Sequence, residues 1–316
     1  MLRLLLAVFL ACALPVQAQY PNKPIRAVVA FGTGGATDVI ARIIAASMSQ
    51  SLGQPIVIEN KPGADGIVAG DYVTKAAPDG YTIFFTSIGH AVNPSLYKDA
   101  KYDPVKDFTP IGQVLSAPNI LVVPGNSPFN TVKDLIAYAK ANPGKLNFAS
   151  SGSGASLHLS AELFMQMVGV EMVHIPYKGT GSLMPDLLSS VVALSFPNFP
   201  SALPFVRSGK LKALGVTTAK RSAAAPQIPT LAEAGVPGYD MSTWYGLVGP
   251  ANMPAEVVAK LNLELRNVLQ DPQVREKLVA QGVDPVTGSP QEFGLFIQEE
   301  TKKWALLLKK IKIEVN

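Results

Sequence analysis

Residues 25–38 read IRAVVAFGTGGATD, an apolar run that ends in a glycine-rich loop. The apolar run has the length and residue types of a β-strand, and apolar residues then recur at helical spacing from Val39 to Leu52. Three more predicted elements continue the alternation: residues 55–59 (strand), 67–77 (helix) and 81–86 (strand). Strands that alternate with helices predict βαβ units and a largely parallel sheet.

A second glycine-rich loop lies in residues 147–156, which read NFASSGSGAS. The apolar run at 147–150 predicts a strand, and the residues after the loop predict a helix at 157–168. The remaining elements of this set are predicted strands at 173–176, 191–196 and 211–217 and a predicted helix at 183–189. Strand, glycine loop and helix thus occur twice, which predicts two similar domains.

The predicted fold class is α/β, with two doubly wound α/β domains joined by a hinge. Domain 1 is predicted to be discontinuous, with residues 19–123 and 247–316, and domain 2 to span 124–246. Ligands bind beyond the carboxyl ends of strands in open α/β sheets, so both glycine loops are expected to face one cleft. The other predicted elements are strands at 108–114 and 120–123, helices at 131–141, 255–269, 272–281 and 290–311, and hinge crossings near 110–124 and 240–250.

Residues 1–18 have the pattern of a secretory signal peptide. Arg3 precedes an apolar stretch at 4–14, and Val16-Gln17-Ala18 is a small-residue cleavage signal. Cleavage after Ala18 would remove Cys12, the single cysteine of the chain. Two other interpretations stay open: an N-terminal core helix, and a lipoprotein with a lipidated Cys12. No later segment has 18 consecutive apolar residues, so we expect a soluble mature protein in the periplasm.

The composition excludes several classes of protein. Of the 316 residues, 48% are hydrophobic and 16% charged, which favours a packed core over a disordered chain. The net charge of +4 has no dense lysine or arginine cluster behind it, so no nucleic-acid partner is expected. One cysteine permits no internal disulfide and no cysteine-rich zinc or iron–sulfur site.

The two glycine loops are candidate anion sites. A helix N-terminus that follows glycines exposes backbone N–H groups and a positive partial charge, which suits a carboxylate or a phosphate. The dinucleotide fingerprint fails because Thr37 stands where a third glycine is needed, and no Gly-Lys-Ser/Thr marks a phosphate-binding P-loop. One glycine turn alone could be purely structural. The pairing of two such loops favours a ligand site.

Catalytic motifs are absent, and we expect no enzyme, no cofactor and no metal. No Gly-x-Ser-x-Gly occurs, and the His158/Glu162 pair lacks the second histidine of a zinc motif. A secreted hydrolase or isomerase using His158 and Ser153 is the alternative. His158 could equally pack, and Asp38 could be an N-cap or contact an amine, hydroxyl or water of a ligand. Phe31, Tyr177, Trp244 and Tyr245 are aromatic candidates for the cleft, each with a core role as the alternative.

The chain resembles the periplasmic substrate-binding proteins of tripartite tricarboxylate transporters, the Bug/TctC family. The segments that carry the resemblance are FGTGGATDVIAR (31–42), ENKPGA (59–64), PDGYT (78–82), SGSGASLHL (151–159), PYKG (176–179), PSALP (200–204), PTLAEAG (229–235) and WYGL (244–247). The resemblance implies a fold like that of type II periplasmic binding proteins, two domains that close on a ligand like a flytrap. It implies that loops 32–38 and 151–156 grip a carboxylate, partly through water.

The same resemblance implies the ligands and partners. The ligands would be di- or tricarboxylates, acidic amino acids or other small carboxylates, including aromatic ones. The partners would be a large and a small membrane permease subunit, with the protein itself a monomer. An orphan receptor that delivers its ligand to a sensor remains an alternative. The predicted ligand-binding residues are Phe31, Gly34, Gly35, Ala36, Thr37, Asp38, Ser87, Ser151, Ser153, Gly154, Ala155, Ser156, His158, Tyr177, Pro197 and Trp244.

One departure from the family pattern bears on the ligand. Residues 192–197 read VALSFP, where the family commonly has Val-Asp-Leu-x-Phe-Asp. Ala193 and Pro197 replace the two aspartates. The loss of a carboxylate at a strand end leads to the hypothesis of a ligand without a cationic amino group.

Overall fold

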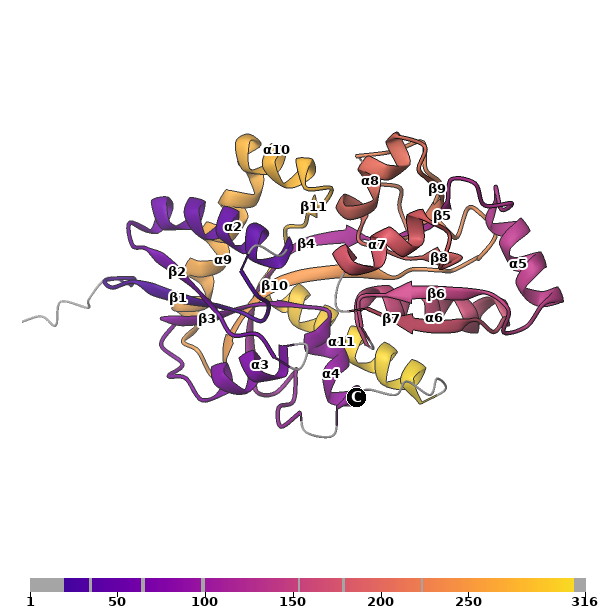
Figure 1. Cartoon of the computed structure of the whole chain (residues 1–316). Helices are drawn as coiled ribbons and strands as arrows, with labels where there is room; N and C mark the ends of the chain where they lie inside the picture. The colour runs from indigo at the N-terminus through magenta and orange to yellow at the C-terminus, as the bar shows by residue number, and fades with distance from the viewer. Residues whose placement is uncertain are drawn as a thin grey trace, which may run out of the picture.

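The computed structural model describes residues 20–33, 36–63, 66–97, 100–152, 154–177, 180–222 and 224–309, with Ala36 described by its backbone only. It contains two β-sheets side by side, each covered by helices (Figure 1). The predicted signal peptide, residues 1–18, lies outside the described residues. Within the described part of the chain, no helix combines the length and apolar character needed to cross a membrane.

The first sheet has six strands in the order β11-β4-β10-β3-β1-β2. Its parallel half comprises β1 (Ile25–Val29), β2 (Ile56–Asn60) and β3 (Thr82–Ser87). Its antiparallel half comprises β4 (Phe108–Pro118), β10 (Ser242–Pro250) and β11 (Asp284–Pro285). Its helices are α2 (Ala36–Leu52), α3 (Ile67–Thr74), α4 (Gly89–Leu96), α9 (Ala255–Gln270), α10 (Pro272–Ala280) and α11 (Pro290–Leu308).

The second sheet has five strands in the order β7-β6-β8-β5-β9. β6 (Asn147–Ser150) pairs in parallel with β7 (Val173–Pro176) and β8 (Leu194–Ser195). β5 (Ile120–Pro124) is antiparallel to β8 and to β9 (Leu211–Val216). Its helices are α5 (Val132–Ala141), α6 (Ser156–Val168), α7 (Thr180–Leu188) and α8 (Phe199–Arg207). The predicted α/β class is confirmed, with antiparallel strands in both sheets.

The chain passes between the sheets twice, and Asn119 joins the two crossings. Asn119 separates β4 from β5 and is fully buried. Its backbone N–H donates to Thr217 Oγ1 over 2.8 Å, and its carbonyl accepts from the Thr217 N–H over 2.9 Å. Thr217 directly follows β9, where the second crossing begins. The predicted domain limits lie inside β5 and β10, so residues 120–123 pair in the second sheet and 242–246 in the first.

Helix α11 begins at the first sheet and continues beneath the second (Figure 1). A capping box at Ser289 and Glu292 fixes where it begins. Phe293, Ile297 and Trp304 are buried along its inner face, in one apolar cluster that also contains residues of both sheets. Burial of this continuous cluster adds a non-covalent link between the two halves to the two chain crossings.

His90 on α4 makes the folded protein sensitive to acid. The ring is buried against Tyr102 and Phe108, and Nε2 lies 3.0 Å from the Pro104 carbonyl. Nδ1 has no hydrogen-bond partner among the residues that the structure describes. Burial, as the largest cause, lowers the pKa of His90 to about 4. The unfolded chain therefore binds a proton on this histidine near pH 6.5, whereas the folded chain binds it only near pH 4.

We expect this difference to lower the free energy of unfolding as the pH falls from about 6.5 toward 4, with no effect at higher pH. Between about pH 7 and pH 5 the wild-type protein should lose about 2 kcal/mol more than the His90→Gln variant. Urea unfolding of both proteins at the two pH values measures this. Equal losses would show that His90 is not the responsible group.

Candidate functional site

A cavity of about 440 Å³ lies between the two sheets, and residues of both line it. Phe31, Ile88 and Tyr245 supply its aromatic and aliphatic wall. Its other lining residues are small or carry a hydroxyl or an amide: Thr37, Ser87, Gly89, Ser151, Ala155, Ser156, Thr180, Asn198, Ser201 and Thr243. Among the described residues, none that lines the cavity is charged. An ion in this space would have to be stabilised by dipoles and neutral donors.

Five helices begin at this cavity. Their first-turn or capping residues belong to its lining: Thr37 of α2, Gly89 of α4, Ser156 of α6, Thr180 of α7 and Asn198, which precedes α8. The first N–H groups of a helix have no partner within the helix. They also carry about half a positive charge at each N-terminus. The cavity is therefore surrounded by donors that favour an anion.

In four of these five helices, the first turn lacks the acidic residues that normally stabilise a helix N-terminus. Helices α4, α6, α7 and α8 have none, and α4, α6 and α8 also have no side-chain cap. Among the helices that begin elsewhere, α5, α9 and α11 have Asp134, Glu256 and Glu292 in their first turns, and α10 is capped by Asp271. Helix α3 has neither an acidic first turn nor a side-chain cap. The helix ends at the cavity are thus left for an anion that is not part of the chain.

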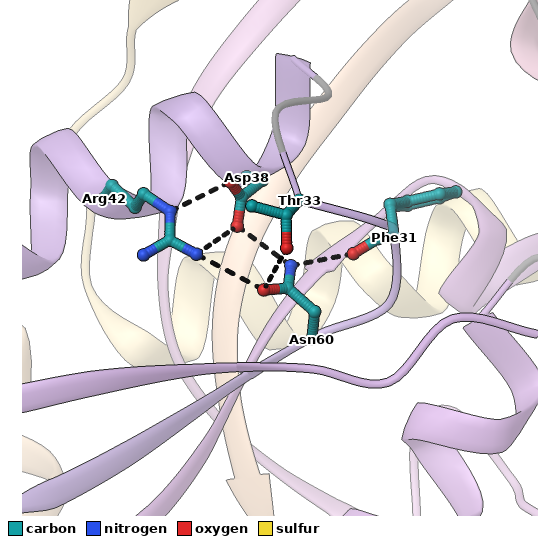
Figure 2. Close-up of polar contacts among 5 residues, drawn as sticks. All are labelled: Phe31, Thr33, Asp38, Arg42 and Asn60. Carbon is teal, nitrogen blue, oxygen red and sulfur yellow. Dashed lines mark hydrogen bonds and ion pairs between the residues drawn. The ribbon is translucent and has the colours of Figure 1, made fainter.

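The exception is α2, whose first turn contains Asp38 (Figure 2). The Asp38 side chain is only 2% exposed. Arg42 donates from Nε to Asp38 Oδ2 over 2.9 Å and from Nη2 to Oδ1 over 3.0 Å. Asn60 Nδ2 donates to the same Oδ1 over 2.8 Å. The charge of Asp38 is therefore neutralised within the chain.

Contacts of the same group connect the residues on either side of the first glycine loop. Asn60, at the end of β2, also donates from Nδ2 to the Phe31 carbonyl over 2.8 Å. Thr33 Oγ1 donates to Asn60 Oδ1 over 3.2 Å. Asp38, Arg42 and Asn60, together called the loop clamp, thus connect the end of β1, the loop, β2 and α2 (Figure 2). The clamp places the Phe31 ring at the cavity wall.

Tyr245 on β10 links the first loop to the strand that crosses toward the second sheet. Its hydroxyl shares a hydrogen bond with the Thr37 side chain at the start of α2. Burial raises the pKa of Tyr245, and this hydrogen bond offsets part of the rise. The phenol is therefore a neutral hydrogen-bonding group in the cavity wall.

The second glycine loop contributes Ser151, Ala155 and Ser156 to the cavity. Gly152 and Gly154 have φ angles of 133° and 82°, which residues with a Cβ rarely adopt. Beneath the loop, His158 is buried and stacks on His174 with ring centroids 3.8 Å apart. The loop conformation therefore depends on two glycines and on the buried side chains below it.

Comparison of the sequence with known protein families identifies the family of this chain. Residues 40–313 match the family model described as the tripartite tricarboxylate transporter family receptor, TctC. The chain belongs to this family. Members of the TctC family are periplasmic substrate-binding receptors rather than enzymes.

Individual relatives align with nearly the whole length of this chain. BugT of Bordetella pertussis is 38% identical over 296 residues, which cover 93% of this chain and 91% of BugT. Among solved structures, R. palustris Rpa4515 with adipate is 38% identical, with a TM-score of 0.83 and coverage of 94% and 100%. MatC from Rhodopseudomonas palustris with bound malate is 33% identical, with a TM-score of 0.79 and coverage of 92% and 100%.

The structure brings some of the predicted site residues of this TctC protein together at the cavity. Six of them line it: Phe31, Thr37, Ser87, Ser151, Ala155 and Ser156. Gly34, Gly35, Ser153 and the side chain of Ala36 lie outside the described residues. Asp38, Gly154 and His158 are buried and do not line the cavity. Asp38 accepts from Arg42 and Asn60, and the Gly154 N–H donates to His158.

Three predicted residues lie away from the cavity lining. Trp244 is fully buried, and its Nε1 donates to Glu300 over 3.2 Å. Because side chains alternate along a strand, its neighbours Thr243 and Tyr245 face the cavity instead. The Tyr177 hydroxyl donates to Asp186 over 2.6 Å, and the Pro197 carbonyl accepts from the Ile120 N–H.

The lining residues absent from the sequence prediction are Ile88, Gly89, Thr180, Asn198, Ser201, Thr243 and Tyr245. The sequence did contain a local signal for Asn198 as the residue that caps a helix, since asparagine followed closely by a proline is typical of a helix start. Tyr245 was considered as an aromatic candidate, but no sequence pattern separated it from Trp244. The others depend on where α4, α7, α8 and β10 begin.

We expect the loop clamp of this TctC protein to stabilise the fold as a unit. Asp38→Ala should lower the free energy of unfolding by about 2 kcal/mol, because it removes charge-assisted hydrogen bonds from a buried position. Chemical denaturation measures the loss. The double variant with Arg42→Ala should lose less than the sum of the two single variants. Strict additivity would contradict the clamp.

Proposed function

We propose that this chain is a periplasmic solute-binding protein that holds a small carboxylate between its two sheets for a tripartite tricarboxylate-type transporter. The observation that carries the proposal is a cavity whose described lining residues are all uncharged and at which five described helices begin, four of them without an acidic first turn. Such a site favours an anion through backbone dipoles and hydroxyl groups. The adipate and malate in the two related structures belong to the same chemical class.

We propose further that the ligand has no cationic amino group. An ammonium ion that enters a cavity of this kind needs a carboxylate partner, because a buried unpaired charge is strongly disfavoured. Ala193 and Pro197 stand where the family commonly has aspartates, and no described lining residue is acidic. Phe31, Ile88 and Tyr245 offer a surface for the carbon chain between two carboxylates. A dicarboxylate therefore fits better than an acidic amino acid.

The proposal includes export and membrane partners. The signal-peptide pattern of residues 1–18 would direct the chain to the periplasm, and the family supplies the expectation of two permease subunits. Ligand capture between two halves of one chain suits delivery, because the liganded form presents a different surface from the free form. A catalytic role for His158 gains no support, since both of its ring nitrogens are engaged within the chain.

A thermal unfolding screen tests the proposal. The panel contains adipate, malate, succinate and citrate, with aspartate, glutamate and adipamide for comparison. A ligand present at 100 times its Kd stabilises the folded state by about 2.7 kcal/mol, which shifts Tm measurably. We expect stabilisation by at least one plain carboxylate, confirmed by calorimetric titration. Tight binding of aspartate or glutamate with no response to dicarboxylates would overturn the ligand class.

A further inference from the structure

Beneath the second glycine loop lies a polar cluster made of Ser150, His158, Glu162 and His174, in which Ser150 and His158 are buried and the other two are partly exposed. His158 is 3% exposed, and its ring is nearly parallel to that of His174, at 11°. Phe148 of β6 packs against both rings, with its centroid 4.9 Å from that of His174 and 6.0 Å from that of His158. None of these side chains lines the cavity, yet the cluster contacts the loop that does.

The hydrogen bonds of His158 determine where its proton lies. The backbone N–H of Gly154 donates to His158 Nδ1 over 3.0 Å, so this nitrogen must present a lone pair. Nε2 lies 3.2 Å from Glu162 Oε1, a carboxylate that can only accept, so Nε2 carries the proton. The geometry therefore requires a neutral imidazole with its proton on Nε2.

The hydrogen bond from the Gly154 N–H to His158 Nδ1 orients the second glycine loop. Gly154 has a left-handed backbone, and the next two residues, Ala155 and Ser156, line the cavity at the start of α6. A protonated His158 would point an Nδ1–H at the Gly154 N–H. Two donors would then face each other in a buried position, and neither would have an acceptor. The loop would have to move to relieve this contact.

The surroundings of His158 include two titratable groups, among the residues that the structure describes. Glu162 comes from α6 itself, and His174 comes from β7. The adjoining strand β6 contributes Phe148 and Ser150, and Ser150 Oγ lies 2.6 Å from His174 Nε2. Burial, and then the neighbouring His158, lower the pKa of His174 to about 4. His174 therefore stays neutral at mildly acidic pH and does not itself account for a pH dependence in that range.

We propose that neutral His158 is the positioning residue of the second ligand loop, and that its protonation releases Gly154 and weakens carboxylate binding. The inference rests on the proposed function. It adds a pH dependence of affinity that comes from the protein rather than from the ligand.

Two substitutions separate the roles of the two ring nitrogens. In His158→Asn, the amide oxygen stands close to the former Nδ1 and can still accept from Gly154, but it does not titrate. In His158→Gln, the amide reaches toward the former Nε2 and leaves the Gly154 N–H without an acceptor. At about pH 7.5 we expect His158→Asn to bind adipate within about threefold of wild type, and His158→Gln to bind about tenfold more weakly.

The pH profile tests the positioning role, because loss of packing alone would not change it. From about pH 7.5 to pH 5.5, the Kd of the wild-type protein for adipate should rise several-fold relative to that of His158→Asn. Protonation of adipate affects both proteins equally, so it cancels in the ratio of the wild-type Kd to the His158→Asn Kd. A ratio that stays constant would overturn the proposal, as would equal affinities of the Asn and Gln variants.

A measurement without ligand keeps this inference separate from the proposed function. Nitrogen-15 NMR of the histidine rings in the ligand-free protein should show His158 as the Nε2–H tautomer near neutral pH, with Nδ1 coupled to the Gly154 amide proton. The other tautomer would overturn the inference. If no carboxylate in the panel binds, the proposed function fails, whereas the ring tautomer still decides whether His158 holds the loop.

Discussion

Ser156→Asp is expected to abolish carboxylate binding while leaving the protein at least as stable as wild type. Ser156 is the first residue of α6 and lines the cavity. An aspartate there would interact with the helix N-terminus in place of the ligand, and would stabilise the helix by about 0.3–1 kcal/mol. It would also repel a carboxylate nearby by about 4 kcal/mol at an effective dielectric constant of 20. The affinity for adipate should fall at least about 100-fold.

Calorimetric titration and chemical denaturation of the same variant measure the two effects. Ala255→Asp is the control, because it also places an aspartate at the first residue of a helix, α9, which does not begin at the cavity. It should raise stability and leave adipate binding unchanged. Ser156→Ala should weaken binding only modestly, through the loss of one hydroxyl. Normal adipate binding by Ser156→Asp would show that the anion does not sit at this helix end.

Glu300→Ala is expected to cause a large loss of stability, about 4 kcal/mol. Glu300 Oε2 accepts from the indole N–H groups of both Trp244 and Trp304, over 3.2 and 3.1 Å. Both indoles are fully buried, and Glu300 also pairs with Lys303. Removing the carboxylate leaves two buried donors unsatisfied, each worth about 1–3 kcal/mol, and opens a cavity beside them. The contact holds α11 against β10.

Urea unfolding followed by tryptophan fluorescence measures this loss directly, since Trp244 and Trp304 are the only two tryptophans of the chain. Glu300→Gln should lose much less, because one amide oxygen can still accept from both indoles. Glu299→Ala removes an exposed carboxylate one residue away and should be nearly neutral. A loss below about 1 kcal/mol for Glu300→Ala would mean that water or a neighbouring group replaces the carboxylate.

The sequence predicted the elements whose patterns are local. The strands at 147–150 and 173–176 agree with β6 and β7 residue for residue, and the predicted helix at 255–269 agrees with α9 to within one residue. These segments combine strong apolar periodicity with clear boundaries, such as Pro254 before α9. The resemblance to the TctC family rested on motifs spread over the chain and is confirmed.

Helix α4 was absent from the prediction for a physical reason. Its eight residues contain Gly89 and Pro94, both poor helix formers. Its stability comes instead from packing: Ala91, Val92 and Asn93 are buried, and the helix lies against α11. Such support comes from residues about 200 positions later in the chain and leaves no local pattern.

Strand β10 was predicted only as a crossing. It is buried along nearly its whole length, so it lacks the alternation of a half-exposed strand, and it contains Gly246 and Gly249. Gly246 is required because a side chain there would collide with the Phe293 ring of α11. Without the strand register, Trp244 and Tyr245 could not be assigned to opposite faces. The misplacement of Trp244 in the predicted site follows from this.

Only part of the loop clamp could be predicted from the sequence. The motif at 31–42 contains both Asp38 and Arg42 at helical spacing, so their pairing could have been anticipated. Asn60 lies on another strand, and only the parallel pairing of β1 with β2 brings it to the loop. The role of Asp38 therefore changes from a possible ligand contact to a group that holds the loop.

The most direct test of the central claim is a crystal structure of the protein with the carboxylate that stabilises it most in the thermal screen. We predict one carboxylate group in the cavity between the sheets, within hydrogen-bonding distance of backbone N–H groups at the starts of α6, α7 or α8. We predict no lysine or arginine among its contacts. A carboxylate bound to a basic side chain, or outside this cavity, would contradict the account.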